Sequence, residues 1–333
     1  MGRSLPRFRR GLWIGLPLLL VALGGGLILF EWGRDREASA AVLEPPVKVD
    51  GARAYRYLKQ LVAIGPRPAG SEANSKQRTL VAAHFKANGG TITEQAFTGF
   101  DPRSKARVNM VNLIGAWHPE RKERIVIGAH YDTRPFPDEE EDPARRSLPF
   151  LGANDGASGV ALLMELAHHL EKLPTDWGVD LVLFDGEELV YGGGRNQLGD
   201  YFLGSNEFAA RYRKGGHDYR YAAGFVLDMV GDKNLNIKQE RNSLSFARGL
   251  MREVWTVARQ VKATGFKNEV GQAVNDDHLP LNDARIPTID LIDFDYPYWH
   301  TSQDLPEHCS GASLEQVGRV ITAWLAKPRS RGK

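Results

Sequence analysis

Two adjacent glutamates stand at the end of an apolar segment of this 333-residue chain. In the stretch "LVLFDGEELVYGGG" (residues 181–194), four apolar residues lead into Asp185, Gly186, Glu187 and Glu188. Like charges repel at close range, and burial raises the cost of keeping both of them charged. A solvated turn would tolerate the pair, and so would a cation bound beside it. The other ionisable residues decide between these two interpretations.

Acidic residues and histidines follow other apolar segments as well. His130 and Asp132 come after "IVIGA", Asp228 comes after "GFVL", and His300 lies in "YWHTSQD". Asp155 lies in the glycine-rich stretch "GANDGASG", just before an amphipathic segment. Each residue taken singly has an ordinary structural explanation, such as a helix cap for Asp155. Together they indicate a divalent cation with oxygen and nitrogen ligands, and zinc fits such a set best.

The composition narrows the possible kinds of site. Cys309 is the only cysteine, so neither a disulfide within the chain nor a cysteine-based zinc site can form. The formal net charge is +2 with acidic and basic residues interspersed, which disfavours a nucleic-acid-binding surface. Histidine, aspartate and glutamate must therefore supply the ligands of any metal.

A scaffold has to bring these distant residues together, and the spacing of apolar residues predicts one. Helical spacing is found in residues 51–65, 71–90, 156–173, 243–265 and 313–326. Strand-like apolar runs occupy residues 109–117, 124–132, 179–188, 222–232 and 286–294. This alternation predicts an α/β fold with a mostly parallel sheet that helices cover on both faces. Side chains beyond the carboxyl ends of such strands share one edge of the sheet, where the candidate ligands would converge.

The remaining polar and aromatic stretches have simpler interpretations. The acidic run at residues 138–142 and the glycine-rich residues 191–205 are expected to be solvated loops. His168 and His169 are expected on an exposed helix surface, away from any metal. Aromatic residues next to Trp299 are expected at the rim of a small-ligand pocket: Phe294, Tyr296 and Tyr298.

The N-terminal part of the sequence indicates export. Residues 1–10 are basic, and residues 11–30 carry no charge and are long enough to span about 30 Å, one bilayer core, as a helix. The positive-inside rule then leaves the N-terminus in the cytoplasm and the rest of the chain on the extracytoplasmic side. The alternative is a signal peptide cleaved at the small residues 38–40, which would give a secreted protein. In either case residues 31–50 would be a linker and residues 51–329 a catalytic domain.

The ordered motifs resemble those of the zinc aminopeptidase superfamily. They comprise His130-x-Asp132, "GANDGASG", "DGEE", "LDMVG" and His300, and the resemblance runs from about Tyr55 to the end. Several stretches are more similar to the glutaminyl-peptide cyclotransferases, the zinc-type glutaminyl cyclases: "AHYDTRPFPD", "YFLGS", "LDMVGDKN", "DDHLPL" and "YWHTSQD". The resemblance implies a three-layer α/β/α sandwich with a mixed, mostly parallel central sheet. It also implies an enzyme that converts the N-terminal glutamine of peptides to pyroglutamate and releases ammonia.

The resemblance also implies which residues hold the metal. Asp155, Glu188 and His300 would bind one zinc ion. Asp132 would orient His130 from behind the ligands. These last two residues are also candidates for a second metal.

The same resemblance implies catalytic and substrate-binding residues. Glu187 would be the general acid/base that takes a proton from the α-amine and returns it to the leaving nitrogen. Asp228 and Asp276 would form a hydrogen-bonded acidic group behind the substrate. Trp299 would line the substrate pocket, and Tyr298 is a further candidate for its wall. A neighbouring zinc would neutralise the other glutamate of the pair, and the shared acidic surroundings would raise the pKa of Glu187.

Two other functions remain open. A zinc aminopeptidase would use the same acid to activate a metal-bound water, and all the ligands of a two-zinc site are present. A catalytically inactive anchored domain would only bind partners, but neither the metal set nor the base is eroded. Tyr191 and glycines stand where the cyclases often have a tryptophan, which leaves substrate recognition open. The expected partners are peptide or protein N-termini and, through residues 11–30, the membrane.

Overall fold

The computed structural model describes residues 42–192 and 197–328. The predicted membrane segment (residues 11–30), the basic residues 1–10 and most of the linker lie outside these ranges. Within them, no helix is both long and apolar enough to cross a bilayer. The described residues fall in one compact unit, Ala40–Lys333.

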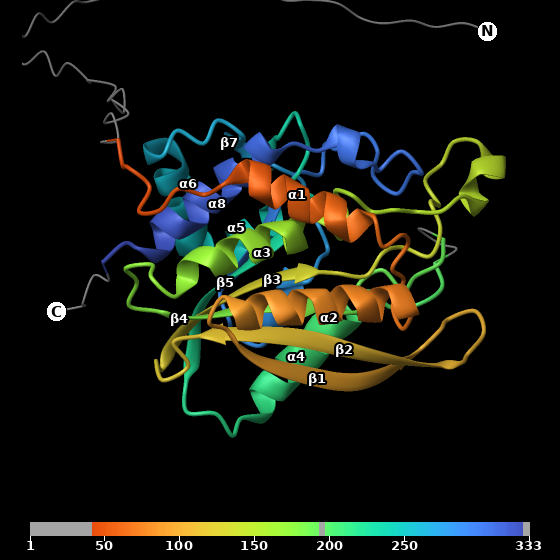
Figure 1. The fold of residues 1–333 in the computed structure, drawn as a ribbon, viewed down its shortest axis with the longest axis horizontal. Coiled ribbons are helices and arrows are strands. Elements are labelled where there is room, and N and C mark those ends of the chain that lie inside the picture. Colours follow the sequence, from red (N-terminus) through yellow and green to blue (C-terminus); the bar gives the residue numbers. More distant parts are fainter. Residues whose placement is uncertain (1–41, 193–196, 329–333) are drawn as a thin grey trace, which may run out of the picture. The chain divides into compact units, whose positions relative to one another are not determined.

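A mixed sheet forms the centre of this unit (Figure 1). Within the described residues it has six strands in the order β1-β2-β4-β3-β5-β8. Their bounds are β1 Thr91–Phe100, β2 Arg107–Trp117, β3 Glu123–His130, β4 Gly178–Phe184, β5 Arg220–Asp228 and β8 Thr288–Ile292. The pairs β1–β2 and β2–β4 are antiparallel, whereas β4–β3, β3–β5 and β5–β8 are parallel. The four parallel strands therefore end on the same edge of the sheet.

Helices cover both faces of the sheet, as the sequence predicts. The helices are α1 Gly51–Val62, α2 Glu72–Ala87, α3 Ser158–Leu170, α4 Leu203–Lys214, α5 Arg241–Phe246, α6 Arg248–Gln260, α7 His278–Asp283 and α8 Gly311–Leu325. Ile125 and Ile127 of β3 pack into the larger core with α1, α2, α3, α6 and α8. Val126 between them points to the other face, where it packs with residues of α4 and α7. Figure 1 shows α1, α3 and α8 stacked together on one side of the sheet.

Local sequence explains why β3 and β4 are the two central strands of the sheet. All seven residues of β4 are buried, and so are seven of the eight residues of β3. Strands buried on both faces are continuous apolar runs, which is the pattern that "RIVIGA" and "GVDLVLF" show. Helix starts are marked as well, because Asp50 and Ser71 accept backbone N–H bonds at the N-termini of α1 and α2.

A small second sheet lies beside the end of β8. It consists of β6 (Ile237–Gln239) and β7 (Phe266–Val270), which pair in parallel. Glu240 follows β6 and caps α5, since its carboxylate accepts the backbone N–H groups of Asn242 and Ser243. Cys309 is buried in the main core, where its backbone forms an isolated bridge with Asp232.

Some elements differ from the sequence prediction. Strand β1 was not expected, because most of its residues alternate between exposed and half-buried positions and give little apolar signal. The expected helix 243–265 is two helices, α5 and α6, which meet at Ala247. The glycine-rich loop ends at Phe202, three residues before its expected end, because α4 begins at Leu203.

Candidate metal centre

Four parallel strands deliver the predicted residues to one edge of the sheet. His130 is the last residue of β3 and Asp228 the last residue of β5. Glu187 and Glu188 follow β4, and His300 lies in the loop after β8. Asp155 joins them from the loop before α3. Residues that are up to 170 positions apart in the sequence thus meet in space, as the topology predicts.

One donor set consists of Asp155, Glu188 and His300. The Nε2 atom of His300 lies 3.0 Å from Oε1 of Glu188 and 3.3 Å from Oδ2 of Asp155. One ligand atom from each residue lies within 4.8 Å of the other two, and all three side chains are buried. Two carboxylates and one imidazole in this arrangement suit zinc, with a position left open for substrate.

A second donor set shares Asp155 with the first. Nε2 of His130 lies 3.1 Å from Oδ1 of Asp155 and 3.1 Å from Oδ1 of Asp228. Each carboxylate oxygen of Asp155 thus faces a different imidazole. The donor types of both sets fit zinc, and Asp155 belongs to both of them.

The backbone of the paired glutamates is held by Asp132. Its Oδ1 and Oδ2 atoms accept the N–H groups of Glu187 and Glu188 at 3.1 and 3.0 Å. By contrast, Oδ1 of Asp132 lies 4.0 Å from Nδ1 of His130, too far for a hydrogen bond. The expectation that Asp132 orients His130 stays a prediction, and the hydrogen bonds of Asp132 hold the backbone of the two glutamates.

Different neighbours give the two glutamates different charge states. Burial opposes the charge of Glu188, but Arg134 and His300 outweigh it and hold its pKa well below the usual value. Arg134 donates to Oε2 of Glu188 at 2.5 Å. Burial and the charge of Glu188 both raise the pKa of Glu187 well above the usual value. One glutamate is therefore compensated as an anion, whereas its neighbour holds a proton more readily than an ordinary glutamate does.

The imidazoles of the centre are strongly coupled to these carboxylates. Burial opposes the charge of His300, but Glu188 and Asp155 outweigh it and raise its pKa to about 9. For His130, hydrogen bonds to Asp155 and Asp228 likewise overcome burial and raise its pKa well above the usual value. A metal that binds here must displace protons from these rings.

Backbone conformation keeps the loops close to the centre. Gly156 has φ +94°, and a Cβ atom there would lie 2.6 Å from the carbonyl oxygen of Asp132. A Cβ atom on Gly159 would lie 2.2 Å from the carbonyl oxygen of Leu227, so glycine lets α3 approach the end of β5. Met229 and His300 adopt positive φ values of 48° and 53° although neither is glycine. Such strain is typical of functional sites, where the surrounding structure imposes it.

Asp276 belongs to a second buried acidic group beside the centre. With His278 and Asp290 it forms a further cluster of possible ligand atoms. Burial raises the pKa of Asp276 and, together with the charge of Asp276, raises that of Asp290 well above its usual value. In the part of the chain that is described, no hydrogen bond joins Asp276 directly to Asp228, but burial and then the nearby charge of Asp276 raise the pKa of Asp228, so the expected acidic group stays a prediction. The side chain of Asp228 faces His130.

The predicted aromatic residues occupy different positions. The Trp299 ring stacks on His300 with a centroid distance of 3.9 Å, so it forms a wall of the centre. The Tyr298 ring stacks on His308 with a centroid distance of 3.7 Å and also contacts the ring of Tyr296. Tyr296 is buried, and its hydroxyl donates to Asp304, so it belongs to the core rather than to a rim.

Several supporting residues were not anticipated from the sequence. Arg134 forms two hydrogen bonds with Asp138, and Asp304 accepts the N–H groups of Asn154 and Asp155. The acidic run at 138–142 is therefore not wholly solvated, since Asp138 pairs with Arg134 and Glu140 is buried. No periodic pattern predicts these contacts: those of Asp304 join segments 150 and 149 residues apart, and Arg134 and Asp138, although only four residues apart, lie outside any helix.

The two helix histidines also differ from the prediction. His168 and His169 are half-buried rather than exposed. The ring of His168 contacts the hydroxyl of Tyr57, and the ring of His169 contacts Glu165. His168 therefore packs α3 against α1, whereas His169 contacts a residue of its own helix.

Comparison with known proteins defines the family. Residues 112–325 match the family model described as "Peptidase family M28", more than half of the chain. The chain belongs to peptidase family M28. This M28 protein is 41% identical to the glutaminyl cyclase of Fimbriiglobus ruber, whose crystal structure it matches with a TM-score of 0.81 over 84% of this chain and 96% of that one. The predicted resemblance to glutaminyl cyclases within a zinc peptidase fold is thereby confirmed.

Two other relatives bear on the metal and the reaction. The M28 protein is 30% identical to a Zn-dependent exopeptidase from Parabacteroides distasonis, with a TM-score of 0.77 over 85% of this chain and 99% of that one. This kinship and the donor sets both support zinc as the metal. Aminopeptidase YwaD of Bacillus subtilis is 26% identical over 313 residues, which cover 90% of this chain. The chain spans 60% of the length of that curated relative.

Proposed function

We propose that this M28 protein is a zinc-dependent glutaminyl-peptide cyclotransferase, which converts the N-terminal glutamine of peptides to pyroglutamate and releases ammonia. One observation carries the proposal: Glu187, with a raised pKa, adjoins a compensated Glu188 in the candidate zinc set. The 41% identity to a bacterial glutaminyl cyclase over most of both chains supports it.

In this proposal Asp155, Glu188 and His300 hold one zinc ion. Bound zinc supplies a Lewis acid that polarises the γ-carbonyl of the substrate glutamine and stabilises negative charge on its oxygen. His130 and Asp228 would support Asp155 from its other side, in line with their 3.1 Å contacts.

The chain's own residues handle the protons. Glu187 accepts a proton from the α-amine of glutamine as the nitrogen attacks the γ-carbonyl carbon. The new C–N bond closes the five-membered ring, and the bond to the amide nitrogen breaks. Glu187 returns its proton to that nitrogen, which leaves as ammonia. A raised pKa suits Glu187 to this task, because a shuttle works best when its pKa lies near the working pH.

Side chains around the metal centre position the substrate. The attack is intramolecular, so the protein needs to hold glutamine in a bent conformation rather than bring two molecules together. Trp299, stacked on His300, offers an apolar face for the glutamine side chain. Asp276 and Asp228 supply acidic groups for the α-amine. Tyr298, which packs against the same apolar cluster as Trp299, is a further candidate for the wall of the substrate pocket.

Aminopeptidase activity is the second candidate function. It is favoured by the second donor set, which offers ligands for a second zinc, and by the similarity to YwaD. In that reaction Glu187 would take a proton from an attacking water molecule instead of an amine.

The proposed setting is the extracytoplasmic face of a membrane. Residues 11–30 would anchor the chain, with residues 1–10 in the cytoplasm and the catalytic domain of residues 51–329 outside. The composition of these segments supports this arrangement, and cleavage near residues 38–40 would instead release the protein. Detection of residues 1–10 in the membrane fraction separates the two alternatives.

Activity and metal content together test the proposed function. The purified chain is expected to form pyroglutamate and ammonia from a glutamine-initiated peptide, with one zinc per chain by elemental analysis. A chelator should abolish this activity, and zinc should restore it. Release of free amino acids from a leucine-initiated peptide, with two zincs per chain and no pyroglutamate, would establish the aminopeptidase instead.

A further inference from the structure

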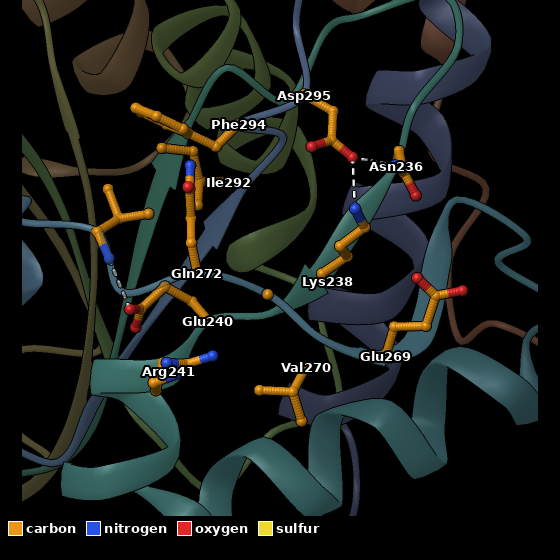
Figure 2. A pocket seen from close by; sticks show the side chains of 12 residues that line it. Asn236, Lys238, Glu240, Arg241, Glu269, Val270, Gln272, Ile292, Phe294 and Asp295 are labelled. Atoms are coloured by element: carbon orange, nitrogen blue, oxygen red, sulfur yellow. Dashed lines mark hydrogen bonds and ion pairs between the residues drawn. The ribbon is translucent and has the colours of Figure 1, made fainter. Parts of the chain in front are cut away.

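A cavity, here called the side cavity, lies next to the small β6–β7 sheet. Its volume is about 350 Å³, in the range of small-ligand sites, which is roughly 300–1,000 Å³. Figure 2 shows Lys238, Glu240 and Gln272 around it, with Asp295 at one end and Val270 at the other. The lining comes from β6, from the end of β7 with the segment that follows it, and from the loop after β8.

An apolar wall connects the side cavity with the candidate metal centre. Val274, Ile292 and Phe294 line the cavity, and they pack in one cluster with Met229 at the end of β5. The Phe294 ring lies 5.1 Å from the ring of Trp299. Because Trp299 in turn stacks on an imidazole of the metal centre, these two rings link the wall of the cavity to the centre.

A second connection runs through buried charged groups. Glu240 lines the cavity, and its Oε2 atom lies 3.4 Å from Nε2 of His278. Nδ1 of His278 lies 3.9 Å from Asp290, which belongs to the same buried cluster as Asp276. The side cavity is therefore linked to Trp299 through Phe294, and to the cluster of Asp276 through His278.

Three acidic side chains, Glu240, Glu269 and Asp295, and two basic ones, Lys238 and Arg241, line the cavity. Lys238 pairs with Asp295 at 2.6 Å. The carboxylate of Glu240 accepts backbone N–H groups at the start of α5 and from Val274. Within residues 42–192 and 197–328, the guanidinium of Arg241 has neither a hydrogen bond nor an ion pair.

We propose that the side cavity binds the residues that follow the N-terminal glutamine of a peptide substrate, and that Arg241 favours a carboxylate among them. The inference rests on the proposed function and names a site for the rest of its substrate. A peptide held by its first residue must lead its chain away from the metal centre. Since an extended chain advances about 3.3 Å per residue, a few residues carry it past Trp299 and Phe294.

A series of substrates of increasing length tests the site. The native protein is given glutaminamide, Gln-Ala-Ala-Ala-amide, and the same peptide with its last alanine replaced by aspartate or lysine. We expect kcat/KM to rise by about tenfold from glutaminamide to the tetrapeptide, the lower end of what one apolar contact contributes. The kcat/KM of the aspartate peptide should be higher than that of the lysine peptide.

Two variants and one matched control assign the effect to the cavity. Val270→Trp should fill the cavity and remove the length advantage without changing turnover of glutaminamide. Val42→Trp is the control, because Val42 is 60% exposed, as Val270 is at 59%, and does not line the cavity. Arg241→Gln should remove the preference for aspartate over lysine and leave the neutral peptide unchanged.

The outcomes separate this inference from the proposed function. Equal kcat/KM for glutaminamide and the tetrapeptide would overturn the inference, as would a length advantage that Val270→Trp leaves intact. Loss of the advantage in Val42→Trp as well would also overturn it. If no substrate, glutaminamide included, yields pyroglutamate, the proposed function itself is overturned.

Discussion

The two adjacent glutamates show how neighbouring residues acquire opposite roles. Glu188 gains Arg134 and His300 as partners, whereas Glu187 gains burial and a like charge. Asp132 holds the backbone of both, so the two side chains cannot exchange places. The difference in pKa therefore comes from the environment of each side chain and not from residue type.

The first prediction concerns Glu187. Glu187→Gln should lower turnover by about 10²–10⁴-fold, because the amide cannot carry the proton. Zinc content should be unchanged, since Glu187 is outside the proposed ligand set. Turnover and elemental analysis on the same sample check both statements, with the exposed Glu141→Gln as control. Native turnover in Glu187→Gln would remove this residue from the mechanism.

The second prediction concerns Arg134. Arg134→Met should destabilise the metal-free protein by about 3–5 kcal/mol, because it leaves the buried carboxylate of Glu188 without its cation. Zinc should compensate for part of this loss, so it should raise the melting temperature more in the variant than in the native protein. Denaturation with and without a chelator measures the difference. An identical loss in both conditions would contradict the assignment of Glu188 as a ligand.

At the scale of elements, the approach of α3 to the sheet depends on the absence of one side chain. The loop before α3 carries Asp155, and α3 begins beside the end of β5. Gly159 allows this contact, since a Cβ atom would lie 2.2 Å from the carbonyl oxygen of Leu227. The position of a proposed ligand is thus set by helix packing.

The third prediction follows from this contact. Gly159→Ala should lower the free energy of unfolding by about 1–3 kcal/mol, because a rigid backbone atom blocks the added methyl group. Gly249→Ala in α6 is the matched control, since a methyl group added there would meet nothing within 4 Å. This second change should be neutral or add up to about 1 kcal/mol through helix propensity. Equal effects at both positions in urea denaturation would contradict the packing argument.

The sequence predicted more of the elements than of their supporting contacts. Continuous apolar runs identified the buried strands, and the motif order placed Asp155, Glu188 and His300 at one edge of the sheet. Edge strand β1 escaped notice because it is half-exposed. Arg134 and Asp304 could not be predicted, since their partners lie 54 and 149 residues away and no periodic pattern links them.

For the whole molecule, one buried acid links the first helix to the core. Glu165 of α3 accepts the backbone N–H of Asp50 at 2.8 Å and pairs with Arg53 at 2.6 Å. Burial opposes its charge, but bonds from His169, Arg53 and Asp50 outweigh it and lower its pKa from 4.5 to about 2. A lowered pKa in the folded state means that its stabilisation is complete above the unfolded pKa and is lost as pH falls toward 2.

The fourth prediction uses this dependence. Glu165→Gln should be less stable than the native protein near neutral pH, and the gap should shrink below about pH 4.5. Urea denaturation at a series of pH values measures it. A gap that stays constant down to about pH 2.5 would show that the charge of Glu165 contributes nothing.

The single thiol of Cys309 can report how often the protein opens locally. It is sealed inside the core beside the turn that follows β5, and burial raises its pKa far from the range in which thiols react. A maleimide or disulfide reagent can therefore modify the thiol only when transient local opening exposes it. The labelling rate would time these openings directly, in the native sequence, without a single engineered residue.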